Sequence, residues 1–148
     1  MSVERRSIYS GSPWEGKVAY CRAKRVGDFI AVSGTVAAGD DGRVVGPGDV
    51  HAQTLHALGR IAKALKELGS SLEDVVRTRC FLTDMDRFED FARAHREVFE
   101  GIDPAASAVE VSRLVPGGFL VEIEVDAIVG ESDEGLRGER VDLPDAVE

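Results

Sequence analysis

Cysteine is scarce in this sequence of 148 residues, which contains only Cys21 and Cys80. The two residues lie far apart and form no CxxC motif, so neither a disulfide framework nor a cysteine-rich metal site is indicated. We interpret both as small apolar residues of a sheet rather than as redox groups. A reducing compartment, the cytoplasm, is the simplest location for such a chain.

Long apolar runs are also missing. The longest largely apolar stretch, residues 29–38, is interrupted by Ser33, Gly34 and Thr35 and is far too short to cross a bilayer. The opening segment, MSVERRSIYSGSPWEG, lacks the apolar region of a signal peptide. We therefore expect no membrane partner.

Basic residues are outnumbered, with 18 lysines and arginines against 27 acids and a net charge of −9. Residues 131–148 contain seven acids and two arginines, which is −5 of that total. We expect one domain over residues 1–129 and an acidic tail over 130–148, either flexible or packed on the surface. Because an acidic chain repels phosphate backbones and its basic residues form no stripe, we expect no nucleic-acid partner.

Apolar periodicity and turn motifs predict a mixed order of strands and helices. The expected strands are residues 18–24, 29–36, 75–82, 108–114 and 119–129, with 43–45 as a candidate short strand. A first helix should begin after Asp49 and stop at Gly69, and a second should be capped by Asp86 and end at Gly101. The order β-β-(β)-α-β-α-β-β is typical of an α+β fold with both helices on one face of a mixed sheet. If the other face is apolar, burial between subunits would cover it.

Alternation along the last strand places Glu122, Glu124 and Asp126 on one face, opposite a row of apolar residues. Three neighbouring carboxylates repel one another unless cations lie beside them. Arg77 and Arg79 share one face of another strand and could form an opposite-charge ladder with them. The acids therefore serve either structural cross-strand pairing or general acid–base chemistry.

Other motifs of catalysis are not found in the sequence. His51 and His56 lie five positions apart, which on a helix points them about 140° apart, and no carboxylates complete a metal-ligand set. Ser33-Gly34 is not a GxSxG elbow, and the glycines before the first helix lack a Walker lysine. We expect no metal and no cofactor. His95, on the apolar side of the second helix, is either a packed residue or a catalytic one.

Residues 104–126, PAASAVEVSRLVPGGFLVEIEVD, resemble the signature of the Rid family, also called the RidA/YjgF or endoribonuclease L-PSP-like family. Tyr20 with the Val26-Gly27-Asp28 turn is similar to the family's opening strand and turn. FIAVSGT at residues 29–35 is similar to its second strand. Residues 74–85 are similar to its middle strand. The resemblance covers residues 12–129.

This resemblance implies a chorismate-mutase-like α+β fold and a homotrimer in which three sheets enclose a barrel, with a ligand cleft at each subunit interface. In the family's deaminases, an arginine binds the carboxylate of an imine or enamine amino-acid derivative, and water hydrolyses the C=N bond to release ammonia. The resemblance carries Tyr20, Ser33, Gly34 and Ser107 over as cleft residues. It carries Glu122 over as the residue that holds the attacking water.

Three positions depart from common family residues: Ala106 replaces the arginine, Ala108 a cysteine and Ala92 an asparagine. The departures imply a subgroup without the catalytic arginine. We therefore expect a small-molecule cleft that includes Ala106, in a protein with little or no 2-iminoacid deaminase activity. The cations that could compensate are Arg22, Arg79, His95 and Arg113. Arg113 is the least remote of them, because strand alternation would place it on the same side as Ser107.

Other functions stay open at this point. Glu122 could activate water against a neutral imine, enamine or related carbonyl derivative, which would make the chain a hydrolase of different specificity. The chain could instead be a structural or interaction protein that uses its acidic tail. RNA cleavage is suggested only by the family's older name, and the charge balance disfavours it.

Overall fold

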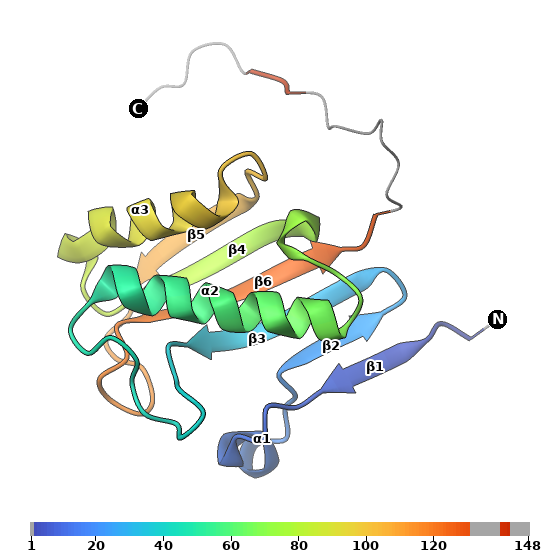
Figure 1. Ribbon diagram of the computed structural model, residues 1–148, viewed down its shortest axis with the longest axis horizontal. Helices are drawn as coiled ribbons and strands as arrows, with labels where there is room; N and C mark the ends of the chain where they lie inside the picture. Colours follow the sequence, from blue (N-terminus) through green and yellow to red (C-terminus); the bar gives the residue numbers. More distant parts are fainter. Residues whose placement is uncertain (1, 131–139, 143–148) are drawn as a thin grey trace.

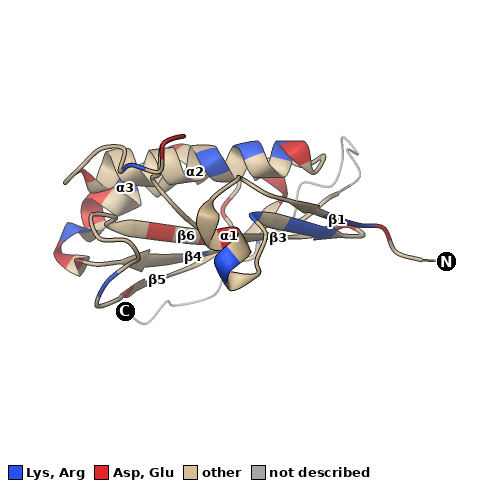
Figure 2. Cartoon of the chain, turned by 90° about the horizontal axis from the view of Figure 1, so that it is seen from below, with Lys and Arg blue, Asp and Glu red and all other residues tan. Residues whose placement is uncertain are grey.

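The computed structural model describes residues 2–130 and 140–142. Six strands form one sheet in the order β1-β2-β3-β6-β4-β5. Two long helices, α2 and α3, cover one face of it (Figures 1 and 2). The strands are β1 (Arg5–Ile8), β2 (Ala23–Val26), β3 (Phe29–Val36), β4 (Val75–Leu82), β5 (Ala105–Glu110) and β6 (Val121–Ile128). The helices are α1 (Pro13–Val18), α2 (Val50–Glu67) and α3 (Phe88–Phe99). Short 3-10 turns cover Leu72–Asp74 and Met85–Arg87.

The sheet is mixed, because β5 runs parallel to β4 while the other neighbouring strands are antiparallel. The last strand, β6, lies in the middle and pairs with β3 on one side and β4 on the other. Its alternate residues Val121, Ile123, Val125 and Ala127 are each at most 1% exposed and face the helices. The expected α+β fold, with both long helices on one face of a mixed sheet, is confirmed.

Helix α2 forms the centre of the helical layer and packs against β3, β6 and α3. The Asp49 side chain accepts a hydrogen bond from Ala52 N at the start of the helix, and Gly69 follows the C-cap with φ +77°. Both termini were predicted from these residues and are confirmed. The inward face of α2 buries Leu58, Ile61 and Leu65, each worth about 1.5–3 kcal/mol of hydrophobic stabilisation.

The N-terminal part of the chain differs from the prediction. Residues 13–18 form the short helix α1, which is capped by Ser12, so the strand expected over 18–24 begins only at Ala23. An additional edge strand, β1, pairs with β2. The candidate strand over 43–45 is reduced to a single bridge between Val44 and Ala38.

Two further boundaries are corrected. The strand expected over 108–114 is β5 at Ala105–Glu110, because parallel pairing with β4 starts at Arg77 opposite Ala105. Asp86 does not cap the second helix. The side chain of Asp84 accepts a hydrogen bond from Asp86 N, and a 3-10 turn precedes α3.

The sheet face opposite the helices has no second layer among the described residues (Figure 2). Phe29, Val109 and Ile128 are 46%, 48% and 51% exposed. The carboxylates of β6 lie on the same face, where Arg79 Nη1 is 3.5 Å from Glu124 and 3.1 Å from Asp126. Cross-strand pairing of these acids is therefore confirmed for Arg79, and such half-exposed pairs contribute at most about 1 kcal/mol.

The acidic tail expected over 130–148 lies outside the described residues, apart from Gly130 and residues 140–142. None of the helices in the described part of the chain combines the length and the apolar character that crossing a membrane requires.

Candidate functional site

A pocket of about 780 Å³ opens between α3 and the edge strand β5. Its size falls within the range of small-molecule sites in proteins. The three positions that depart from common family residues, Ala92, Ala106 and Ala108, all line it. Ser107, His95 and Cys80 line it as well.

The register of β5 explains how its residues divide between the two sheet faces. Ala106 lies opposite Thr78, and Ala108 lies opposite Cys80. Both of these β4 residues are buried on the helix side. Ser107 lies opposite Arg79 and so belongs to the open face. Ala106 and Ala108 therefore present only methyl groups to the pocket beneath α3.

The titratable groups deepest in the pocket are neutral at physiological pH. Burial lowers the pKa of His95 below its ordinary value, and its Nε2 lies 3.0 Å from the Thr78 hydroxyl. Burial raises the pKa of the Cys80 thiol to about 12, so this cysteine is no nucleophile. His95 is thus a packed and hydrogen-bonded residue, as one of the two sequence interpretations held.

Cations at the pocket mouth are already paired with acids. Arg96 Nη2 lies 3.0 Å from Glu100 Oε1, and Arg140 Nε lies 2.7 Å from Asp142 Oδ1. Within the described part of the chain, no cluster of three metal-binding side chains is found. Each arginine of the pocket lining therefore lies beside an acid among the described residues.

A second group of residues gathers at an irregularity in β3. Pairing with β6 shifts by one residue between Val32 and Thr35, which leaves Ser33 and Gly34 in a bulge. The Glu122 side chain covers Gly34 so closely that a Cβ there would lie 2.7 Å from its Oε1. Only glycine leaves room for the carboxyl group in this position.

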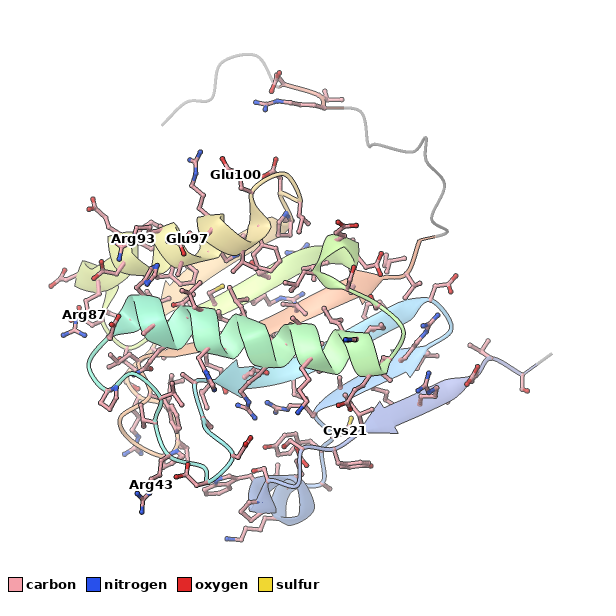
Figure 3. All side chains as sticks on the ribbon, viewed as in Figure 1. Cys21, Arg43, Arg87, Arg93, Glu97 and Glu100 are labelled. Atoms are coloured by element: carbon pink, nitrogen blue, oxygen red, sulfur yellow. The ribbon has the colours of Figure 1, made fainter. Side chains whose placement is uncertain are left out.

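Arg22 lies beside the same bulge. Its Nη1 donates to Gly34 O at 3.0 Å and to Thr35 Oγ1 at 3.1 Å. The guanidinium carbon is 5.8 Å from the centre of the Tyr20 ring. Arg22 is 8% exposed, and its buried Nε has no hydrogen-bond partner among the described residues. Cys21 immediately precedes it, just before β2 (Figure 3).

The surroundings of this second group change the pKa of Glu122. Burial raises the pKa of the Glu122 carboxyl, the positive charge of Arg22 partly offsets that effect, and Glu124 adds to it. A half-buried carboxyl with a raised pKa exchanges protons more readily near neutral pH than an ordinary glutamate. The group can therefore serve acid–base chemistry.

The structure divides the predicted site residues between two places in one protomer. Tyr20, Ser33, Gly34 and Glu122 gather around Arg22, whereas Ala106 lines the α3–β5 pocket. Ser107 borders that pocket, but its register with Arg79 assigns it to the open face of the sheet. Arg113 belongs to neither place and is exposed. Strand alternation does not extend to it, because β5 ends at Glu110.

These contacts show which of the candidate cations are available to compensate for the arginine that Ala106 replaces. Arg79 is occupied by two carboxylates, and His95 is neutral. Arg22 faces the Glu122 cluster rather than the pocket. The sequence placed Phe88 and Phe99 on the second helix by their spacing, but it did not predict that they line a pocket.

Comparison with known proteins relates this chain to one family. Residues 13–129 match the family described as Endoribonuclease L-PSP. The chain is 36% identical over 128 residues to the uncharacterized protein SCO2049 of Streptomyces coelicolor, covering 86% of this chain and 95% of that protein. It is 39% identical over 106 residues to a RutC family protein of Sulfurisphaera tokodaii, covering 72% and 84%.

Solved structures agree with this relationship. One is the crystal structure of Rv2704 from Mycobacterium tuberculosis, a member of the YjgF/YER057c/UK114 family. Its sequence is 44% identical to this chain, and the two structures superpose with a TM-score of 0.77. The match covers 85% of this chain and 100% of Rv2704. The YjgF gene product of E. coli is 30% identical with a TM-score of 0.67, covering 74% and 87%.

The raised pKa of Glu122 predicts a pH-dependent gain in stability for Glu122→Gln. Where folding raises the pKa of a carboxyl, its ionisation favours the unfolded state. This cost is absent at low pH, where both states are protonated. It appears as the pH rises through the ordinary glutamate value and is complete above the folded-state pKa. Chemical denaturation should show a more stable variant at about pH 8 and no difference near about pH 4.

Glu124→Gln is the matched control, because Glu124 lies on the same strand face but pairs with Arg79. It should not gain stability at the higher pH. A Glu122→Gln variant less stable than the wild type at about pH 8 would contradict the assignment.

Proposed function

This chain belongs to the Endoribonuclease L-PSP family, also called the Rid or YjgF family, and we propose that it binds a small molecule at subunit interfaces and lacks 2-iminoacid deaminase activity. The observation that carries the proposal is the composition of the α3–β5 pocket. Ala106 stands where the family's deaminases hold the carboxylate-binding arginine, and Ala92 and Ala108 stand beside it. We assign the chain to a subgroup that lacks this arginine.

The absence of the arginine disfavours ligands that carry a carboxylate, because the interaction that is lost is a strong one. An arginine–carboxylate pair is bidentate and charge-assisted, and in a partly dry cleft it contributes several kcal/mol. Alanine offers no hydrogen bond in its place. The arginines at the pocket mouth, Arg96 and Arg140, are already paired with acids. A 2-imino acid would therefore bury its carboxylate without a partner.

A homotrimer is part of this proposal. The open sheet face exposes Phe29, Val109 and Ile128, and apolar side chains of this size on an uncovered sheet favour burial against another copy. The partners that we propose are two further copies of the chain and a small ligand, with neither nucleic acid nor membrane.

Analytical ultracentrifugation tests the assembly. Three copies of the 15.9 kDa chain should sediment together at micromolar concentration. Phe29→Glu places a charge on the exposed sheet face and should shift the protein toward monomer. The matched control is Lys63→Glu on the outer side of α2, which should leave the mass unchanged. A monomeric wild-type protein would overturn the trimer.

Ammonia release tests the lack of deaminase activity. With enzymatically generated 2-iminobutanoate as substrate, the wild-type protein should not accelerate hydrolysis over buffer. A Rid deaminase that retains the arginine, assayed in parallel, should do so. Robust acceleration by this chain at low protein concentration would contradict the proposal.

A second candidate function is hydrolysis of an uncharged imine or enamine, and the position of Glu122 favours it. The Glu122 carboxylate would take a proton from water while the water oxygen bonds to the C=N carbon and the π electrons move to nitrogen. Return of that proton to nitrogen gives a carbinolamine. Glu122 then takes the proton of the new hydroxyl group and passes it to nitrogen as the C–N bond breaks, which leaves a carbonyl group and ammonia. The raised pKa of Glu122 suits a group that must both accept and return a proton.

A screen of uncharged imines and enamines tests this alternative. If Glu122 is the general base, Glu122→Gln should lose about 100-fold or more of any measured rate. Glu124→Gln, two residues along the same face of β6, should retain most of it. Equal rates in wild type and Glu122→Gln would rule the mechanism out.

A further inference from the structure

One wall of the α3–β5 pocket is a continuous row of rings. Phe88, Phe91, His95 and Phe99 recur on one face of α3, and all four line the pocket. Successive ring centres are 5.8, 5.6 and 4.7 Å apart, which is the spacing of interacting aromatic pairs. Phe88 is 42% exposed, whereas Phe91 and Phe99 are only 5% and 2% exposed, so Phe88 is the phenylalanine of this row that a ligand can reach.

The facing wall is made of small side chains. Ala106 and Ala108 of β5 project toward α3. Ala92 adds a methyl group on the α3 side. The rings are tilted by 48°, 50° and 43° to one another, so the accessible ring of Phe88 and the methyl groups of β5 form the apolar part of the lining. This apolar part is suited to a flat molecule that stacks on the exposed ring of Phe88.

The ring row itself offers one polar group, the His95 imidazole. Nε2 of His95 is bonded to Thr78, and Nδ1 makes no hydrogen bond within the described residues. Because the imidazole is neutral, this nitrogen can serve a ligand amide or carbonyl group, depending on the tautomer. Asp103 also lines the pocket and has no ion-pair partner in the part of the chain that the structure describes. It would repel an anionic ligand.

We propose that the α3–β5 pocket takes a flat, uncharged aromatic molecule with one amide-like polar group, stacked on the ring row and hydrogen-bonded at its inner end. The inference rests on the proposed small-molecule function and names its ligand class. The ring of Phe88 selects for flatness. Asp103 selects against carboxylates, and each cation that lines the pocket lies beside an acid among the described residues.

Four probes of similar size separate these properties. Benzamide is flat and neutral, benzoate is its anionic analogue, benzamidine is its cationic analogue, and cyclohexanecarboxamide keeps the amide but is not flat. Binding would be measured on the full chain by NMR titration, with the backbone amides of α3 and β5 as reporters. We expect benzamide to bind about tenfold more tightly than benzoate or benzamidine and about fivefold more tightly than cyclohexanecarboxamide.

Two variants of α3 link the preference to the ring row. Phe88→Leu keeps an apolar side chain but removes the exposed ring, and it should abolish the preference for benzamide over cyclohexanecarboxamide. Glu89→Ala, an exposed neighbour outside the pocket lining, should leave it unchanged. Far-UV and amide spectra identical to those of the wild type would show that both variants are folded.

Each of the other binding results contradicts one part of the proposal. Equal binding of benzoate and benzamide would overturn the uncharged ligand class while leaving a small-molecule site intact. Tighter binding of benzamidine would overturn it in favour of a cation held by Asp103. Equal binding of benzamide and cyclohexanecarboxamide would overturn the aromatic class. If no probe perturbs α3 or β5 at millimolar concentration, both the ligand class and the proposed binding function fail.

Discussion

The alternation of side chains along β6 is the constraint on which the rest of the structure depends. Val121, Ile123 and Val125 form the floor of the core, so the residues between them must face the other side of the sheet. A slip by one residue would bury three carboxylates, which costs far more than the sheet can supply. The same register that builds the core therefore places Glu122 over the bulge at Gly34.

Small residues then give both candidate sites their shape. Gly34 lets the Glu122 carboxyl lie directly on the backbone, in a position that a Cβ would occupy. Ala106 and Ala108 leave the space beneath α3 open, so that the rings of the helix become a wall of the pocket. At both sites, a small residue leaves space that a larger side chain would fill. The Glu122 carboxyl occupies that space at Gly34, and the pocket occupies it beneath α3.

The sequence predicted the elements whose signals are local and repeated. Strand 75–82 was predicted with both boundaries, and α2 was predicted with its cap and stop, because strand alternation or helical periodicity marks each one. The six-residue helix α1 is too short to show a period, and β5 gains its boundaries from parallel pairing with a distant strand. Burial of Arg22 could not be foreseen, because arginine is read as exposed unless its partners are known.

The two sheet faces connect the assembly to the ligand. Within one protomer, Ala106 faces the helices while Glu122 lies on the open side with Arg79 and its acids. A ligand in the α3–β5 pocket of that protomer is therefore on the wrong side of the sheet to meet its own Glu122. If the carboxyl acts on the bound molecule, a second copy must supply it by docking its open face against the pocket. Catalysis by Glu122 would thus require the oligomer, and the same docking would place the α3–β5 pocket at a subunit interface.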